Sequence, residues 1–330
     1  MKTSLPNLVS RVLVLLAAIV LALAQGGAQA RPGHAFSQQE LDQMLAPIAL
    51  YPDALLSQIL MAATYPIEVA EAARWSRARP GLSGDDATRA AAAETWDPSV
   101  KSLVAFAQLL ERMEQDPQWT LALGDAFLDQ QAQVMDTVQA LRRRAEAAGN
   151  LRSDDRLRVL DSGSRLMLEP ADPQLIYVPY YDPLVVYGPW WSPAYPPVYW
   201  RPWPGYYARP GYLSGLYWGP AIGISAGFFF GAFDWHRRQV RVVHVNNYYY
   251  GHGAAVNRGV TANRVPGTWH HEPARRRGVT YRGIEAQRRF DAASARPSHD
   301  NRASPAETRA RAPTAQATQP APAMPSAPTA

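Results

Sequence analysis

The chain has 330 residues, a formal net charge of +5 and no cysteine. The absence of cysteine excludes disulfide bonds, thiol enzymes, thiolate-bound metals and cysteine-ligated iron–sulfur clusters. A chain of this length can form one or two domains, and here they must be held together by burial rather than by cross-links.

The N-terminal segment, residues 1–30, is typical of a secretory signal peptide. Lys2 and Arg11 supply a positive start, and an unbroken apolar run follows that is too short to span a bilayer comfortably. Ala28 and Ala30 give the small-x-small pattern that a signal peptidase recognises. We therefore predict cleavage after Ala30 and export to the periplasm or cell envelope. The alternative is an uncleaved membrane anchor.

Charge is distributed unevenly along the chain. Residues 31–234 contain 16 basic and 23 acidic residues, net −7, whereas residues 235–330 contain 15 arginines and 5 acidic residues, net +10. This asymmetry favours self-association or contact with an anionic surface. In an exported protein the available polyanions are envelope lipids and cell-wall polymers, so no nucleic-acid partner is expected. The plainer alternative is a solvated tail without a specific partner.

Residues 31–150 are predicted to form an all-α domain. Ser37 and Glu40 make a capping-box pattern, and apolar residues at helical spacing follow them. Asp53 is predicted to cap the next helix, again followed by apolar residues at helical spacing. The apolar faces are sufficient for one hydrophobic core.

Two later helices have the same start signal. Asp97 and Asp116 each precede a proline, which places a capping carboxylate before a residue that suits the first helical turn. The three arginines at 142–144 suit the negative end of the last helix dipole. Gly149 is a natural stop for that helix.

The hydrophobic period changes from helical to alternating in residues 151–218. The stretch "RLRVLDSGSRLMLEP" predicts a β-hairpin around the turn "DSGS". Two similar segments follow, "DPQLIYVP" from Asp172 and "DPLVVYGP" from Asp182, and each is predicted to be an Asp-Pro turn followed by a short extended run. A catalytic carboxylate has no reason to recur in register, so the repetition favours architecture over catalysis.

The Tyr/Trp/Pro-rich part of this region is the strongest binding candidate. Exposed rings beside prolines can stack on sugar faces, dock Pro-rich peptides or lie at a membrane interface. The alternative is that the rings bury one another and cover the helical domain. The binding candidates are Tyr177, Tyr180, Tyr181, Asp182, Tyr187, Trp190, Trp191, Trp200 and Trp203.

Residues 219–280 contain an apolar glycine-rich stretch and then a predicted strand region rich in His and Arg. The glycines recur at every fourth residue, which would place them on one helical face and allow close helix packing, especially in lipid. These packing candidates are Gly219, Gly223, Gly227 and Gly231. Residues 281–330 lack core-forming residues and are predicted to be a disordered basic tail.

Three patterns that suggest chemistry are weak. The stretch "GISAG" around Ser225 matches a nucleophile elbow, but a Pro-aromatic segment precedes it in place of the required strand. The late histidines lack i, i+4 spacing, so we predict no metal and no cofactor. These histidines are His236, His244, His252, His270 and His271.

The third pattern is a pair of glutamates one helical turn apart, which occurs as Glu68 with Glu71 and as Glu111 with Glu114. The two carboxylates of a glycosidase must flank the bond from two walls of a cleft. One-turn spacing on a surface helix is more typical of a solvated face. We therefore predict no acid or base role for them.

Several segments together resemble a known family. They are "LAPIALYPDALLSQILMAATYPIEVAEA" (45–72), "WDPSVKSLVAF" (96–106), "WTLALGDAFLDQQAQVMDTVQALRRRA" (119–145), "IYVPYYDPLVVYG" (176–188) and "HHEPARRRGVTYR" (270–282). Through these segments the sequence is similar to the exported bacterial family called domain of unknown function 3300, over roughly residues 37–290. The resemblance implies an envelope location, no established activity and no catalytic residues.

The sequence therefore predicts an α+β protein: an N-terminal all-α helical domain, a small β-hairpin and Pro-aromatic segment packed on it, and a disordered basic C-terminal tail. The predicted function is non-enzymatic binding or scaffolding in the cell envelope. The predicted partners are cell-wall glycan, an anionic envelope surface or an envelope protein. One alternative is a membrane-associated assembly through the glycines at 219–231, and another is a hydrolase that uses Ser225.

Overall fold

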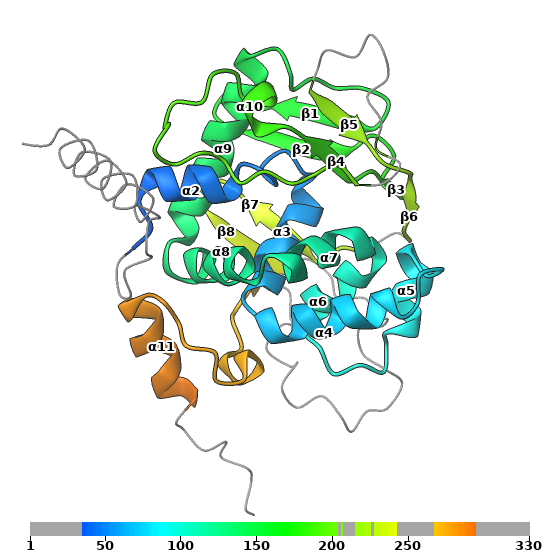
Figure 1. The fold of residues 1–330 in the computed structure, drawn as a ribbon, viewed down its shortest axis with the longest axis vertical. Coiled ribbons are helices and arrows are strands. Elements are labelled where there is room, and N and C mark those ends of the chain that lie inside the picture. Colours follow the sequence, from blue (N-terminus) through cyan, green and yellow to red (C-terminus); the bar gives the residue numbers. More distant parts are fainter. Residues whose placement is uncertain (1–34, 204–205, 207–214, 226–227, 243–266, 295–330) are drawn as a thin grey trace, which may run out of the picture. The chain divides into compact units, whose positions relative to one another are not determined.

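The structure is a computed structural model that describes residues 35–203, 206, 215–225, 228–242 and 267–294. These residues belong to one compact unit that extends to Ala295. Helices from the first half of the chain pack with short antiparallel sheets from the second half (Figure 1), so the predicted α+β class is confirmed. The predicted signal peptide and Gly227 lie outside the described residues.

One helix, α3, lies at the centre of this arrangement (Figure 1) and contacts α4, α6, α8, β2 and β7. All of its residues from Leu55 to Ala63 are buried, including the polar Ser57 and Gln58, as expected for a mostly apolar helix in the core. The helices of this region are α2 (Gln38–Leu45), α3 (Asp53–Ala63), α4 (Pro66–Arg77), α5 (Gly84–Ala90), α6 (Pro98–Leu103), the 3-10 turn η1 (Val104–Phe106), α7 (Ala107–Gln115), α8 (Pro117–Asp129) and α9 (Gln131–Ala147).

The predicted helix starts and stops are confirmed at four places. Ser37 and Glu40 bond reciprocally, with Ser37 N donating to Glu40 Oε2 at 2.8 Å and Glu40 N donating to Ser37 Oγ at 3.3 Å. The carboxylates of Asp97 and Asp116 each accept a backbone N–H of the first turn at 2.9 Å. Gly149 ends α9 with a left-handed φ of 76°, which glycine adopts at little cost.

Asp53 does not cap α3, and the prediction for it was wrong. Its Oδ1 accepts from Arg142 Nη1 at 2.6 Å and from Leu168 N at 3.3 Å. Its Oδ2 accepts from Trp235 Nε1 at 2.7 Å. One carboxylate thus joins α3 to α9, to the second strand of the hairpin and to the residue that follows β7.

Of the three arginines predicted near the end of α9, Arg144 lies in its last turn, whereas Arg142 lies earlier and is completely buried. Its guanidinium donates to the carbonyl oxygens of Ala49 (2.9 Å), Tyr51 (3.1 Å) and Leu166 (2.8 Å), in addition to Asp53. A buried charge is tolerated only when it is paired and its donors are satisfied, and both conditions are met here.

Short antiparallel sheets connect segments that are far apart in the sequence. Strands β1 (Leu157–Asp161) and β2 (Leu166–Pro170) form the predicted hairpin, with Val159 opposite Leu168. The remaining pairs are β3 (Leu175–Ile176) with β6 (Ile222–Gly223), β4 (Pro179–Tyr181) with β5 (Leu216–Trp218), and a three-stranded sheet in the order β7 (Gly231–Asp234), β8 (Gln239–Val242), β9 (Gly267–Thr268).

The two Asp-Pro segments begin alike and then differ. Asp172 accepts from Gln174 N at 2.8 Å and Asp182 accepts from Leu184 N at 2.9 Å, so both carboxylates form the predicted turn. The first segment then continues into β3. The second forms the short helix α10 (Pro183–Val186) in place of the predicted extended run.

The predicted helical glycine face does not form. Gly223 and Gly231 lie in strands β6 and β7. A Cβ at Gly231 would lie 2.6 Å from Met61 Cε, and one at Gly219 would lie 2.2 Å from Tyr206 Oη, so these glycines allow close packing inside the fold. Within the described ranges, none of the helices combines the length and apolar character needed to cross a membrane.

Part of the predicted disordered tail is ordered. Residues 284–294 form helix α11 (Ile284–Ser294), which contacts α8. Ala286 and Phe290 lie one turn apart on its buried face and pack with Tyr281. Residues 295–330 lie outside the described part of the chain.

The two neighbouring arginines of α9 provide a test of this fold. We expect Arg142→Met to lower the free energy of unfolding by about 3–5 kcal/mol, because the partly buried Asp53 would lose its charge partner and three carbonyl oxygens would lose their donor. Arg143→Met should cost under about 1 kcal/mol, because Arg143 makes solvent-exposed ion pairs with Glu146 and Asp161. Urea unfolding followed by tryptophan fluorescence measures both; equal losses would contradict the assignment.

Candidate functional site

A groove of about 650 Å³ between α2, α8 and residues 280–287 is the candidate site. Its lining combines apolar rings, side-chain amides and carboxylates. The lining residues are Phe36, Glu40, Gln43, Met44, Asp116, Gln118, Trp119, Leu121, Ala122, Asp125, Val198, Thr280, Tyr281, Arg282 and Gln287.

The helical side of the groove is fixed by two long-range sets of hydrogen bonds. Trp119, in the first turn of α8, donates from Nε1 to the carbonyl of Met44 in α2 at 2.9 Å. Gln130 bonds both backbone groups of Phe36, accepting from its N–H at 2.6 Å and donating to its carbonyl at 3.0 Å. These contacts set the spacing of α2 and α8 and thus the width of this side.

The other side is built by residues 280–287, which overlap the end of residues 270–282, the stretch we call the arginine segment. Its last residue, Arg282, lies over the ring of Phe36, with the guanidinium carbon 3.8 Å from the ring centroid. Arg282 Nη2 is also 3.6 Å from Glu40 Oε1. The cation–π contact and the ion pair hold this wall against α2.

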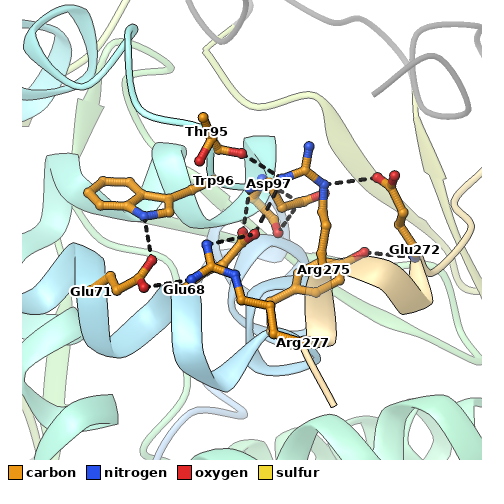
Figure 2. A network of polar contacts seen from close by, with 10 residues as sticks. Glu68, Glu71, Thr95, Trp96, Asp97, Glu272, Arg275 and Arg277 are labelled. Atoms are coloured by element: carbon orange, nitrogen blue, oxygen red, sulfur yellow. Dashed lines mark hydrogen bonds and ion pairs between the residues drawn. The ribbon is translucent and has the colours of Figure 1, made fainter. Parts of the chain in front are cut away.

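Three consecutive arginines anchor this segment to the helices. Within it, η4 (Pro273–Arg276) packs on α4. Arg275 donates from Nε to Glu272 Oε2 at 2.8 Å and from Nη1 to the carbonyl of Thr95 at 2.6 Å. Arg275 Nη1 also lies 3.3 Å from Glu68 Oε1 in α4, and Figure 2 shows this network.

Glu68 is buried, which corrects the predicted solvated face. Its Oε2 accepts the backbone N–H of Asp97 at 2.5 Å, while Asp97 itself caps α6. Glu71, one turn further along α4, is less buried and accepts from Arg277 Nη1 at 2.6 Å and from Trp96 Nε1 at 3.0 Å (Figure 2). The two glutamates therefore hold different parts of the arginine segment and the loop before α6.

Burial shifts the pKa of the groups in this network. Removal from water raises the pKa of Glu68 to about 7, even though the Asp97 N–H and Arg275 oppose the shift. The pKa of Asp97 is raised for the same reason. Burial together with the charge of Arg275 lowers the pKa of Lys101 to about 8. The network thus contains ionisable groups that titrate near neutral pH.

Arg276 forms the second buried ion pair of the segment. Its Nη2 lies 2.5 Å from Asp125 Oδ1 in α8, and both side chains are almost fully buried. Arg276 also donates to the carbonyl of Thr64 at 3.3 Å and lies over the ring of Tyr281. Burial raises the pKa of Asp125 to about 6, with Arg276 opposing the shift.

His271 is part of the packing around this segment. Its ring stacks on Tyr65 with centroids 5.1 Å apart, and its Nε2 lies 2.9 Å from Tyr281 Oη. Burial and the nearby arginines lower its pKa to about 3, so the ring is neutral at physiological pH. The described part of the chain contains no group of three or more His, Asp or Glu residues that could hold a metal ion.

The two oppositely charged parts of the chain pair with each other through such contacts. Arginines from the basic C-terminal part pair with carboxylates from the acidic part of the same chain. The pairs are Arg238 with Asp136, Arg275 with Glu68, Arg276 with Asp125, Arg277 with Glu71, and Arg282 with Glu40.

The aromatic binding candidates are packed against one another and against the helices. Among them, Trp191 donates to Asp42 at 2.7 Å and Tyr187 donates to the carbonyl of Ala46 at 2.7 Å. Tyr180, Tyr181, Tyr187, Trp200 and Trp203 are buried, and Tyr177, Asp182, Trp190 and Trp191 are partly buried. The rings therefore bury one another and cover the helical domain, which is the alternative given in the sequence analysis.

Ser225 lies between β6 and β7, and its hydroxyl is buried with no hydrogen-bond partner. A nucleophilic serine needs a base within hydrogen-bond reach. The described surroundings of Ser225 therefore lack the arrangement that a nucleophile elbow requires. Of the five late histidines considered as metal ligands, His244 and His252 lie outside the described residues.

The groove was not predicted from the sequence. Its lining residues come from four segments, two of which were interpreted only as helix faces. One signal was present: the acidic helices and the "ARRR" run carry opposite charges, and such runs pair when the chain is compact. The pattern could not show which carboxylate each arginine meets.

The fold thus consists of helices around α3, a cover of mutually packed aromatic residues, and an arginine segment held by buried ion pairs. The chain belongs to the family described as Protein of unknown function (DUF3300), whose match extends over residues 37–271. The family resemblance seen in the sequence is confirmed.

A relative in Escherichia coli (strain K12), called Uncharacterized protein YacH, is 36% identical to the chain over 312 residues. The match covers 78% of this chain and 50% of that protein, so the chain spans about half the length of the relative. No solved structure matches the chain.

The raised pKa of Glu68 predicts that the free energy of unfolding depends on pH. Below about pH 4.5 the carboxyl is protonated in both the folded and the unfolded chain, and between about 4.5 and 7 only the folded chain keeps the proton. The buried Glu68 carboxyl therefore stabilises the folded chain at low pH, and this contribution to the free energy of unfolding is lost as the pH rises through 7. Between pH 4.5 and 7.5 the free energy of unfolding of the wild type should fall by about 3 kcal/mol relative to Glu68→Gln.

Urea unfolding at a series of pH values measures this difference. Glu111→Gln on α7 is the matched control, because Glu111 is exposed and should leave the pH dependence of the wild type unchanged. Parallel stability curves for the wild type and Glu68→Gln would show that the buried carboxyl does not titrate as stated.

Proposed function

We propose that this chain is an exported, non-enzymatic binding protein of the cell envelope that holds a cell-wall saccharide in the groove between α2, α8 and residues 280–287. The observation that supports the proposal is the mixed character of the lining. Apolar rings lie beside amides and carboxylates in a groove large enough for a few sugar residues.

Each kind of lining group has a counterpart on a saccharide. The C–H face of a sugar ring packs on apolar surface, and the partly exposed Leu121, Ala122 and Val198 supply it. The rings of Phe36, Trp119 and Tyr281 lie almost fully buried in the lining beneath them. Sugar hydroxyls exchange hydrogen bonds with amides and carboxylates, and Gln43 and Gln118 are accessible examples. The rigid walls reduce the entropy lost on binding.

Filling the groove should abolish binding. Ala122 is a partly buried lining residue of α8, so Ala122→Phe should lower retention by purified peptidoglycan at least about tenfold, because the added ring occupies the ligand's volume. Co-sedimentation of the protein with peptidoglycan measures retention.

Ala140→Phe is the matched control, since Ala140 is an exposed alanine of α9 that lines neither the groove nor its walls. It should bind as the wild type does. Failure of the wild type to sediment with peptidoglycan, or equal retention of the Ala122→Phe protein, would refute saccharide binding in the groove.

Export is a separate part of the proposal and has its own test. The signal-peptide pattern of residues 1–30 predicts a periplasmic or envelope-associated protein whose first residue is Arg31. Fractionation of cells followed by mass spectrometry of the intact protein measures location and N-terminus together. A cytoplasmic protein that retains residues 1–30 would contradict export.

A further inference from the structure

A second pocket, of about 510 Å³, lies where the β1–β2 turn meets strands β7 and β8. It is separate from the groove and shares no lining residue with it. The hairpin contributes two serine hydroxyls and an arginine, and the other side contributes two aromatic rings and a second arginine. These residues are Ser162, Ser164, Arg165, Phe233, Trp235 and Arg241.

Two arginines and one carboxylate line this pocket, namely Arg165, Arg241 and Asp234. At the hairpin side Arg165 and Arg238 share a single carboxylate, that of Asp136, at 3.9 and 2.8 Å. Next to them Arg143 pairs with both Asp161 and Glu146. The described charges at the hairpin side therefore balance, and the guanidinium of Arg165 keeps only a long contact to a carboxylate.

The strand side of the pocket carries the excess of positive charge. Asp234 lines the pocket and accepts from both the backbone N–H (3.0 Å) and the side chain (3.1 Å) of Arg237. These bonds, with a smaller contribution from the charge of Arg241, lower the pKa of Asp234. Among the described residues of this side, Arg237 and Arg241 thus face one carboxylate, which is paired with Arg237, and the remaining positive charge of Arg241 favours an anion.

An aromatic surface adjoins these charges. The rings of Phe233 and Trp235 have centroids 4.4 Å apart. Trp235 is held in place because its Nε1 donates to Asp53 at 2.7 Å. A ligand in the pocket therefore meets a fixed apolar surface next to two guanidinium groups and two hydroxyls.

We propose that this pocket binds a phosphate ester of a sugar or polyol. A phosphate offers several strong acceptor oxygens and about two negative charges, which suit guanidinium and hydroxyl donors better than a single carboxylate does. The pocket is larger than a bare phosphate needs, and the Phe233 and Trp235 rings can pack on the carbon skeleton of a sugar or polyol.

Titration calorimetry on the protein from Arg31 onward tests the proposal with glucose 6-phosphate, inorganic phosphate and glucose. Glucose 6-phosphate should bind at least about tenfold more tightly than glucose, and more tightly than inorganic phosphate. Affinity should fall as salt is added, because the interaction is between charges.

Arg241→Gln should weaken binding of glucose 6-phosphate at least about threefold, and the double variant Arg165→Gln/Arg241→Gln at least about tenfold. Arg241 is exposed, so its replacement leaves the core intact. Arg158→Gln is the matched control, because Arg158 is an exposed arginine of the same hairpin that does not line the pocket. It should bind as the wild type does.

Two results would overturn the proposal: glucose 6-phosphate binding no more tightly than glucose, or binding that is unchanged in both arginine variants. A second arm identifies the source of the phosphate. Retention on vesicles that contain phosphatidylglycerol, but not on phosphatidylcholine alone, with release by glucose 6-phosphate, indicates a lipid-borne phosphate ester. Calorimetric binding without vesicle retention indicates a soluble or polymer-borne sugar phosphate.

Discussion

The ion pair between the buried Arg142 and the partly buried Asp53 is the contact on which the arrangement of the chain depends. Arg142 satisfies the carbonyl oxygens that end the 49–51 turn and begin β2, and Asp53 accepts from α9, from β2 and from Trp235. Both partners are needed, because either charge left alone in the core would cost several kcal/mol. The pair therefore fixes where the hairpin and the β7–β8 sheet lie on the helices.

The arginine segment places the last part of the chain by the same physical rule. Arg275 and Arg276 reach carboxylates that are almost fully buried in α4 and α8, and Arg282 closes the segment over Phe36. Each of these carboxylates needs its partner, since a buried carboxylate left unpaired would cost several kcal/mol. The wall of the groove thus follows from charge pairing as well as from apolar burial.

The Tyr/Trp/Pro-rich part of residues 151–218 stabilises the fold through tyrosine and tryptophan rings, each of which carries one polar group. Its prolines prevent regular helix, while its tyrosines bury their rings and satisfy distant backbone groups. Tyr181 accepts from the N–H of Leu50 at 3.1 Å, and Tyr206 donates to the carbonyl of Val178 at 2.9 Å. Among the described residues 172–218, Val198 alone lines the groove and none lines the second pocket.

The sequence by itself determined the helix starts at Ser37, Asp97 and Asp116 and the β1–β2 hairpin, because capping and alternation depend on neighbours in the chain. Only the tertiary structure decided that Glu68 is buried, that Gly231 packs against α3, that residues 284–294 are helical and that two pockets form. Each of these features depends on contacts between segments up to about two hundred residues apart, such as Glu68 with Arg275. Local periodicity carries no information about which distant charge or ring a side chain will meet.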